Sequence, residues 1–301
     1  MISSKDLFRV TLLGTGAPPP SLDRFGPSTL VEVGENKFLF DAGRGALQRL
    51  FQLGIPFGDI TGIFLTHHHS DHVVGFADLW LTGWIRRPWG KRVLPLKIWG
   101  PHGTHQMATH LPLAFATDIR VRAHSYNAEG VKLEPSEIKE GVVYEDDSTS
   151  ITAFEVDHGG EKLDAFGYRI DHGSRSFVLS GDTTFNENLI DHAQNTDLLV
   201  HEVTHGMGDG IERANLERIR ANHTIPEDAG RVFSRTRPKL AVYTHILLFG
   251  DATSDDLIPA TRATYDGPLV VGEDLMQFTI NNEITVTRMP QPPPSTTRIA
   301  F

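Results

Sequence analysis

The chain has 301 residues and a formal net charge of −10, from 28 lysines and arginines against 38 aspartates and glutamates. Its hydrophobic fraction of 39% is that of a globular protein and excludes a disordered chain. It contains no cysteine, which excludes disulfides and thiolate chemistry, and no apolar run that could span a membrane, while its acidic balance is a poor match for a polyphosphate partner.

The first residues lead into a strand-like run without an apolar secretion segment, so we expect a cytoplasmic protein. Runs rich in β-branched and aromatic residues, separated by glycine and proline turns, predict strands along most of the chain. These runs cover residues 8–13, 29–33, 37–40, 60–66, 96–99, 151–156, 165–170, 176–180, 197–200 and 240–244.

Helices are predicted between the strands, at residues 46–53, 102–111, 186–193 and 226–236. The last has Thr224 as a capping candidate and Pro226 in its first turn. Strands mixed with helices predict an α/β fold of two sheet layers with helices outside, forming one domain over residues 1–288. The proline-rich tail, residues 289–301, is either a loose terminus or an arm that braces a dimer.

Four histidines and an aspartate stand within six positions, directly after a buried strand: His67, His68, His69, Asp71 and His72. Neutral imidazole and carboxylate are the usual ligands of zinc and similar divalent ions. Because side chains alternate along an extended segment, His67 and His69 can point to the same side. Asp71 and His72 follow the turn and can reach a second ion. His68 points the other way and is not expected to be a ligand.

Three further candidate ligands stand at the ends of later strands: His158, Asp182 and His245. His158 precedes two glycines, and Asp182 follows a glycine in a turn that directs its carboxylate outward. Each is a weak signal alone. Arranged in this order behind the first cluster, they indicate enough ligands for two metal ions.

The pattern His67-x-His69-x-Asp71-His72, followed by His158, Asp182 and His245, resembles the metallo-β-lactamase superfamily, and within it the ribonuclease Z-like branch. The resemblance extends from about residue 8 to about residue 280. Further supporting segments are residues 13–16, 40–43, 180–183, 201–204 and 223–224.

This resemblance implies an αββα sandwich with two zinc ions at one edge, between the sheets, where Mn²⁺ or iron can replace zinc in one site. Two such cations lower the pKa of a shared water and produce hydroxide at ordinary pH, and Asp71 can orient that water. The resemblance implies that one ion is held by His67, His69 and His158. The other is held by Asp71, His72 and His245, and Asp182 bridges the two.

Glu202 and His223 match the positions that form a proton-donating or phosphate-contacting pair in ribonuclease Z-like proteins. A carboxylate beside an imidazole raises the imidazole pKa, so His223 can act as a general acid. The alternative is a structural hydrogen bond with a helix cap at residues 223–224. Asp41 is a candidate partner for a ligand imidazole, with a plain turn cap as its alternative.

The sequence departs from the transfer-RNA-processing members of this branch, which carry a long basic arm between the equivalents of His158 and Asp182. Here only 23 residues lie between them, which leaves room for a strand pair and a turn. Arg44 stands where those enzymes usually have an acidic residue, and residues 24–29 resemble arylsulfatase and phosphodiesterase-like relatives. With the acidic net charge, these features favour a small anionic ester over nucleic acid as the substrate.

Residues 78–92 interleave three tryptophans with four cations. This segment either lines an aromatic pocket, with Arg86 or Arg87 contacting an anion, or serves core packing and dimer contact. Among the remaining histidines, His201 and His205 are expected to support the ligands or lie on the surface. Three others are expected on the surface of a helix: His102, His105 and His110.

We therefore predict a dinuclear zinc hydrolase of phosphodiester or aryl sulfate esters, with Asp71, Glu202 and His223 as catalytic residues and a homodimeric assembly. A lactone or β-lactam hydrolase is one alternative, because the same hydroxide attacks acyl carbons. A ribonuclease that processes transfer-RNA 3′ ends is the second. A non-catalytic metal-binding regulator is the third, and the pair of Glu202 and His223 argues against it, because a binding module needs no proton donor.

Overall fold

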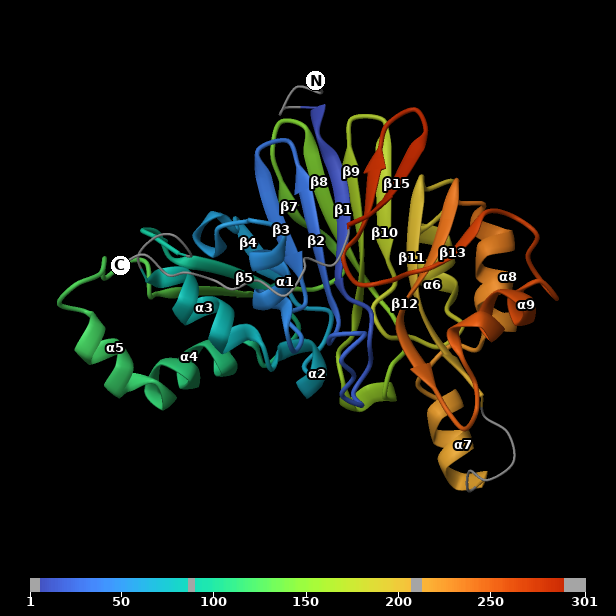
Figure 1. Ribbon diagram of the computed structural model, residues 1–301, viewed down its shortest axis with the longest axis horizontal. Coiled ribbons are helices and arrows are strands. Elements are labelled where there is room, and N and C mark those ends of the chain that lie inside the picture. The colour runs from blue at the N-terminus through green and yellow to red at the C-terminus, as the bar shows by residue number, and fades with distance from the viewer. Residues whose placement is uncertain (1–5, 86–89, 207–212, 290–301) are drawn as a thin grey trace.

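Two β-sheets pack face to face in the computed structural model, with helices on both outer sides of the pair (Figure 1). The structure describes residues 6–85, 90–206 and 213–289, so the proline-rich tail beyond Met289 lies outside it. This architecture confirms the predicted α/β sandwich of two mixed sheets. Among the described residues, no helix has the length and apolar character needed to cross a membrane.

The first sheet has the strand order β15-β14-β1-β2-β3-β4-β5-β6. It is antiparallel from β15 to β3 and parallel from β3 to β6. Its strands are β1 (Phe8–Gly14), β2 (Ser28–Val33), β3 (Asn36–Phe40), β4 (Gly62–Phe64), β5 (Leu96–Gly100), β6 (Leu133–Glu137), β14 (Met276–Ile280) and β15 (Ile284–Arg288).

The second sheet has the order β13-β12-β11-β10-β9-β8-β7. It is parallel from β13 to β10 and antiparallel from β10 to β7, so β8 runs in the same direction as β10. Its strands are β7 (Gly141–Glu145), β8 (Thr149–Glu155), β9 (Phe166–His172), β10 (Arg175–Leu179), β11 (Leu198–His205), β12 (Leu240–Leu248) and β13 (Leu269–Val271).

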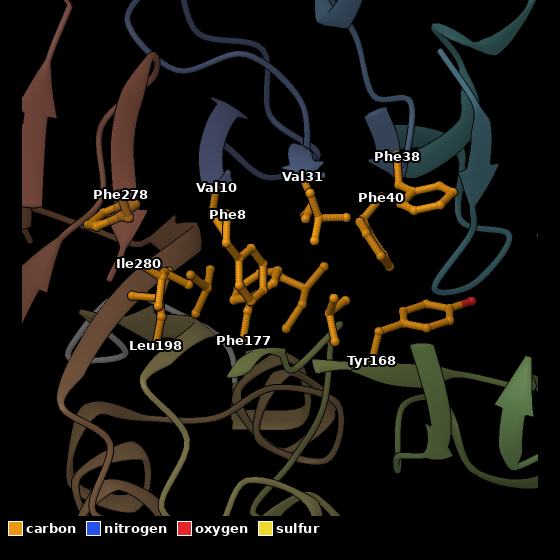
Figure 2. Close-up of a cluster of buried hydrophobic side chains, with 14 of the residues drawn as sticks. Phe8, Val10, Val31, Phe38, Phe40, Tyr168, Phe177, Leu198, Phe278 and Ile280 are labelled. Atoms are coloured by element: carbon orange, nitrogen blue, oxygen red, sulfur yellow. The ribbon is translucent and has the colours of Figure 1, made fainter. Parts of the chain in front are cut away.

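The main core fills the space between the two sheets (Figure 2). Phe8 and Phe40 of the first sheet face Phe177 and Tyr168 of the second, and all four are fully buried. The rings of Phe40 and Tyr168 meet edge to face at 5.2 Å between centroids. Burial of each such side chain stabilises the fold by about 1.5–3 kcal/mol, and together they hold the two sheets against each other.

Helices cover the outer face of each sheet through two further apolar clusters. Helices α1, α3 and α4 pack on the first sheet, and α6, α8 and α9 on the second (Figure 1). The helices are α1 (Ala46–Gln52), α2 (Ser70–Val73), α3 (Phe76–Trp84), α4 (Thr104–Ala114), α5 (Ala116–Arg122), α6 (Glu187–His192), α7 (Arg213–Arg220), α8 (Pro226–Thr236) and α9 (Leu257–Thr261), with short 3₁₀ turns η2 (Phe57–Asp59), η3 (Gly160–Lys162) and η4 (Ser254–Asp256).

The start of α8 differs from the prediction. Pro226 does open the helix, but the preceding cap position is Ile225, and no side chain caps it. Thr224, predicted as the cap, is buried and donates its hydroxyl to the carbonyl of Thr183 at 2.6 Å. The hydroxyl is therefore used to tie the chain to the turn after β10.

Two of the tryptophans in the segment 78–92 serve core packing. Trp80 and Trp84 are buried on α3 and donate their indole N–H groups to backbone carbonyls at 2.8 and 2.6 Å. Arg92 is also buried and donates to the carbonyls of Trp80 and Gly130. The predicted anion contacts of Arg86 and Arg87 lie outside the described residues.

Candidate metal centre

The seven predicted metal ligands meet at one edge of the sandwich, where the carboxyl ends of strands from both sheets come together. From the first sheet, His67 and His69 follow β4, and Asp71 and His72 lie in α2. The second sheet contributes the turn after β8, the turn after β10 and a residue of β12: His158, Asp182 and His245. All are buried except His69, which is exposed.

Three imidazoles converge on one point. Nε2 of His67 lies 3.0 Å from Nδ1 of His69, and Nε2 of His158 lies 3.1 Å from the same atom. The carbonyl oxygen of Asn222 accepts a hydrogen bond from Nδ1 of His158 at 2.7 Å. Because a carbonyl can only accept, Nδ1 carries the proton and the lone pair of Nε2 faces the other two rings.

Asp41 supports the ligands of both sets. Its Oδ2 accepts from Nδ1 of His72 at 2.8 Å and from the hydroxyl of Thr66 at 2.8 Å, and its Oδ1 accepts from the backbone N–H of Thr66. That hydroxyl in turn lies 3.0 Å from Nδ1 of His67 and can accept its proton. Both rings therefore turn Nε2 toward the cluster, and Asp41 takes the partner position that the sequence suggested.

The two carboxylates lie between the imidazoles. Oδ2 of Asp182 is 3.2 Å from Nε2 of His245, 3.4 Å from Nε2 of His72 and 3.7 Å from Nε2 of His158. Oδ2 of Asp71 is 3.4 Å from Nε2 of His245. Asp182 is thus within reach of both ligand sets, and Asp71 is on the side of the second.

A β-bulge directs His245 into this cluster. The register between β11 and β12 shifts so that Glu202 pairs with Thr244 and Val203 with Ile246, which leaves His245 as an extra residue. Its φ of 42° lies in the left-handed region, which residues other than glycine adopt only uncommonly. Bulges of this kind redirect a side chain beside functional sites.

Burial and neighbouring charges set the protonation of the cluster. Burial lowers the pKa of His67 well below its usual range and that of His158 to about 4. At Asp182 burial acts to raise the pKa, but the charges of His245 and His72 outweigh it and hold that pKa well below its usual range. Neutral imidazoles and ionised carboxylates are the forms that bind metal ions.

The carboxylates around His72 favour a positive charge at this position. Burial opposes its protonation, yet Asp182 and Asp41 raise the pKa of His72 well above its usual range. Its Nε2 is buried and makes no hydrogen bond to any described residue. A divalent cation between these nitrogen and oxygen atoms would supply the positive charge that the carboxylates favour and would give Nε2 of His72 a partner. The residues therefore fit a metal site. Within 4.8 Å, the ligand atoms form groups that include His67, His69 and His158; Asp71, His72 and His245; and His67, His72 and Asp182.

Glu202 and His223 lie together at the border of the cluster. Oε1 of Glu202 accepts from Nδ1 of His223 at 3.0 Å and from the backbone N–H of Thr183 at 2.9 Å. Although burial acts to lower it, the Glu202 carboxylate raises the pKa of His223 to about 9. The His223 ring is 5.0 Å from the ring of His158, centroid to centroid.

The other histidines lie apart from the ligand groups. Nε2 of His68 is 3.1 Å from the hydroxyl of Thr104, on the side away from its neighbours, as predicted. His201 is fully buried and donates from Nδ1 to the carbonyl of Glu202 at 2.6 Å. The predicted surface histidines of α4 and the turn before it are exposed: His102, His105 and His110.

Sequence reasoning missed Thr66 and Asn222, which hold the outward nitrogens of two ligands. Thr66 is a short polar residue directly before the ligand cluster, which is a usable signal for such a partner. The contribution of Asn222 comes from its backbone carbonyl, which every residue has, so its side-chain identity gives no signal.

Comparison with known proteins identifies the family. Residues 36–246, more than half of the chain, match the beta-lactamase superfamily domain. This chain belongs to the metallo-β-lactamase superfamily. Its similarity to proteins named ribonuclease Z places it in the ribonuclease Z-like branch, and it is a metal-dependent hydrolase. The 23 residues between His158 and Asp182 form only η3, β9 and β10, so this described segment contains no arm.

Two relatives show how far the similarity extends. The chain is 34% identical over 281 residues to "Ribonuclease Z" of Mycolicibacterium gilvum (strain PYR-GCK), covering 91% of this chain and 97% of that protein. It is 35% identical over 286 residues to "Ribonuclease Z" of Mycobacterium sp. (strain KMS), covering 93% of this chain and 99% of that protein.

Solved structures of the superfamily share the fold. The metallo-beta-lactamase fold protein YhfI from Bacillus subtilis superimposes with a TM-score of 0.72 at 20% identity, over 91% of this chain and 100% of that one. The short form of human tRNase Z gives 0.64 at 21% identity, over 89% and 98%. A diphosphatase from the PhnP family gives 0.64 at 17% identity, over 93% and 100%.

Proposed function

We propose that this chain is a dinuclear zinc hydrolase that cleaves phosphodiester bonds in small anionic substrates. The observation that carries the proposal is the contact of the Glu202–His223 pair with a cluster of ligands for two ions: His223 can protonate a leaving group beside the ions. Zinc is proposed because imidazole and carboxylate are its usual ligands in a site without cysteine, and Mn²⁺ or iron suits one position as well.

The proposed ligand sets are those that the superfamily pattern implied. Bound ions would lower the pKa of a shared water and polarise the substrate oxygen. Asp71 can accept a hydrogen bond from that water, because its carboxylate faces the cluster from α2. The first ion is assigned to His67, His69 and His158, the second to Asp71, His72 and His245, and the bridge to Asp182.

The proposed proton donor is His223. The Glu202 carboxylate holds its ring by Nδ1, which leaves Nε2 as the free donor position. The side chain of His223 is 13% exposed and that of Glu202 is fully buried, so the pair is open on the histidine side only. This orientation supports proton donation to a leaving-group oxygen, which general acids accelerate by about 10²–10⁴-fold.

The phosphodiester class is favoured by the relatives named ribonuclease Z. An exposed cation in a turn that contacts the site supports an anionic substrate: Arg44 is exposed and lies two residues after Ala42, whose N–H donates to the carbonyl of His72 at 2.7 Å. The net charge of −10 and the short connection between His158 and Asp182 favour a small ester over transfer RNA. Homodimeric assembly stays a prediction.

The second candidate is transfer-RNA 3′ processing, which the names of the same relatives favour. A steep fall of cleavage rate with salt would support it, because many phosphate contacts release counterions. Aryl sulfate, lactone and β-lactam hydrolysis remain competing activities of the same arrangement.

The decisive experiment measures metal content together with turnover of an aryl phosphodiester, an aryl sulfate, a lactone, a β-lactam and a precursor transfer RNA. We expect two zinc ions per chain and preference for the small phosphodiester. Arg44→Gln should slow the phosphodiester and leave lactone turnover unchanged. Preference for lactone or β-lactam would overturn the substrate class, and efficient processing of the precursor would replace it by the second candidate. Failure to bind metal would overturn the whole proposal.

A further inference from the structure

A buried carboxylate outside the ligand set, Asp274, anchors the loop that runs from Thr15 to Pro27. Its Oδ1 accepts from the backbone N–H and the hydroxyl of Thr15, both at 2.9 Å. Its Oδ2 accepts from the N–H of Phe25 at 2.8 Å and from Arg49 at 2.8 and 3.2 Å. The side chains of Arg49 and Asp274 are only 4% and 2% exposed, so this is a buried ion pair with additional backbone donors.

A second cation closes the same network. Nη1 of Arg24 donates to the hydroxyl of Thr15 at 2.7 Å and to the carbonyl of Gly272 at 2.6 Å. The N–H of Gly16 donates to the carbonyl of Phe25 at 2.8 Å, so the loop is closed at its base. Thr15 is fully buried and is the residue on which these contacts converge.

Thr15 passes this constraint to the metal centre. Its carbonyl accepts a hydrogen bond from the N–H of Ile246 at 2.9 Å. Ile246 directly follows His245, the extra residue of the β-bulge, which has no pairing position of its own on β11. The bond to Thr15 therefore fixes the chain immediately after the bulge. It does so at a position that β13 does not reach, because β13 pairs with β12 only at residues 241–243.

We propose that Asp274 is a positioning residue for the second metal subsite, acting through Thr15 on the bulge that directs His245. It contributes no ligand. By fixing the carbonyl of Thr15, it holds His245 at a φ of 42°, an orientation that the backbone would otherwise relax. This inference rests on the two-ion assignment of the proposed function.

The test measures the affinities of both zinc ions by competition with a chromophoric chelator, in the full chain and in Asp274→Asn. The variant keeps the size of the side chain but loses its charge and presents an N–H group to donors. We expect one of the two dissociation constants to rise by about 10–100-fold, as for other residues that orient a ligand, and the other to stay unchanged. Thr15→Val, which keeps the carbonyl but loses the hydroxyl, should give a smaller change in the same constant.

The matched control is Asp197→Asn. Asp197 is also a buried carboxylate that accepts from a backbone N–H, that of Ser176 at 2.7 Å, and it pairs with Lys239 at 2.6 Å. It lies directly before β11, away from the loop that Asp274 anchors. Asp197→Asn should lower the denaturation midpoint of the metal-free protein and leave both dissociation constants unchanged. If Asp274→Asn behaves in the same way, with both constants within twofold of the original chain, the inference is wrong. If the original chain itself fails to bind two ions, the proposed function falls, and this inference with it.

Discussion

Asp41 and His72 link the turn after β3 to the second ligand set: Oδ2 of Asp41 accepts from Nδ1 of His72 at 2.8 Å. Asp41 has a φ of 58°, a left-handed conformation that aspartate and asparagine tolerate better than most residues. The turn after β3 therefore places the Asp41 carboxylate against Nδ1 of His72, while Nε2 of the same ring faces the cluster.

The substitution Asp41→Asn tests this link, because asparagine keeps both the shape and the backbone conformation but carries no charge. We expect zinc affinity at the subsite of His72 to fall by about 10–100-fold, measured by chelator competition. The control is Asp256→Asn, which removes a capping carboxylate of η4 and should leave zinc affinity unchanged. An unaltered affinity in Asp41→Asn would show that the charge of Asp41 does not support the ligand.

His223→Ala tests the proton donor. Turnover of substrates with poor leaving groups should fall by about 10²–10⁴-fold, and turnover of substrates with activated leaving groups should fall much less, because only the former need a proton. Zinc content should be unchanged. Equal losses for both kinds of substrate would rule out general-acid catalysis by this residue.

Glu202→Gln should change the pH dependence of the same step. Gln keeps the acceptor for the N–H of Thr183 but removes the charge that raises the pKa of His223 to about 9. The protonated ring is needed, so the rate falls as pH rises through this pKa. The alkaline limb of the profile for a poor leaving group should therefore move to lower pH, and an unmoved limb would contradict the assignment.

Because His201 is buried, we expect the folded protein to lose stability in acid, and this effect does not depend on catalysis. Burial lowers the pKa of His201 to about 4, against 6.5 for an unperturbed histidine, so between these values the unfolded chain binds the extra proton. The unfolding free energy therefore falls as pH drops from 6.5 to 4, by about 3 kcal/mol in full for this group. His201→Asn can still donate to the Glu202 carbonyl and should flatten that fall in urea titrations of the metal-free protein. The same slope in both chains would show that His201 is not the titrating group.

The candidate ligands could be picked out from the sequence because most of them follow a recognisable apolar strand, and Asp71 and His72 come directly after the histidines that end one. Ile63 and Phe64 precede His67, Phe154 precedes His158, and the apolar run of β12 leads to His245. Parallel strands bring such ends to one edge, so the order of the residues was enough. The strand at 60–66 is shorter than predicted, only Gly62–Phe64, because the chain leaves the sheet to place the histidines.

Other parts of the structure had no local signal. Strand β6, Leu133–Glu137, is polar and contains Pro135, which is tolerated because β6 is at the end of its sheet. The link of Asp274 to Thr15 joins residues 259 positions apart, and neither belongs to a motif that indicates the other. Supporting groups of this kind depend on tertiary packing, whereas the ligand types depend on chemistry that the sequence displays.

The position of Gly43, directly after Asp41 and Ala42, has no room for a side chain. A Cβ atom at this position would lie 2.5 Å from the backbone carbon of Gly26 and 2.6 Å from the carbonyl oxygens of Pro27 and Asp71. All three are backbone atoms, so no side chain can move aside. Gly43→Ala should therefore lower the free energy of unfolding by about 1–3 kcal/mol and displace the start of α2, which weakens zinc binding.

Urea unfolding and chelator competition on Gly43→Ala measure both effects, and Gly54→Ala is the matched control. Gly54 has a φ of 69°, and a Cβ atom added there would have no other atom within 4 Å, so alanine meets conformational strain of about 1–2 kcal/mol but no clash. It should lower stability and leave zinc affinity unchanged. If Gly43→Ala also left zinc affinity unchanged, the contact between this turn and α2 would not be what places Asp71, and the position of that carboxylate would have to depend on the helix itself.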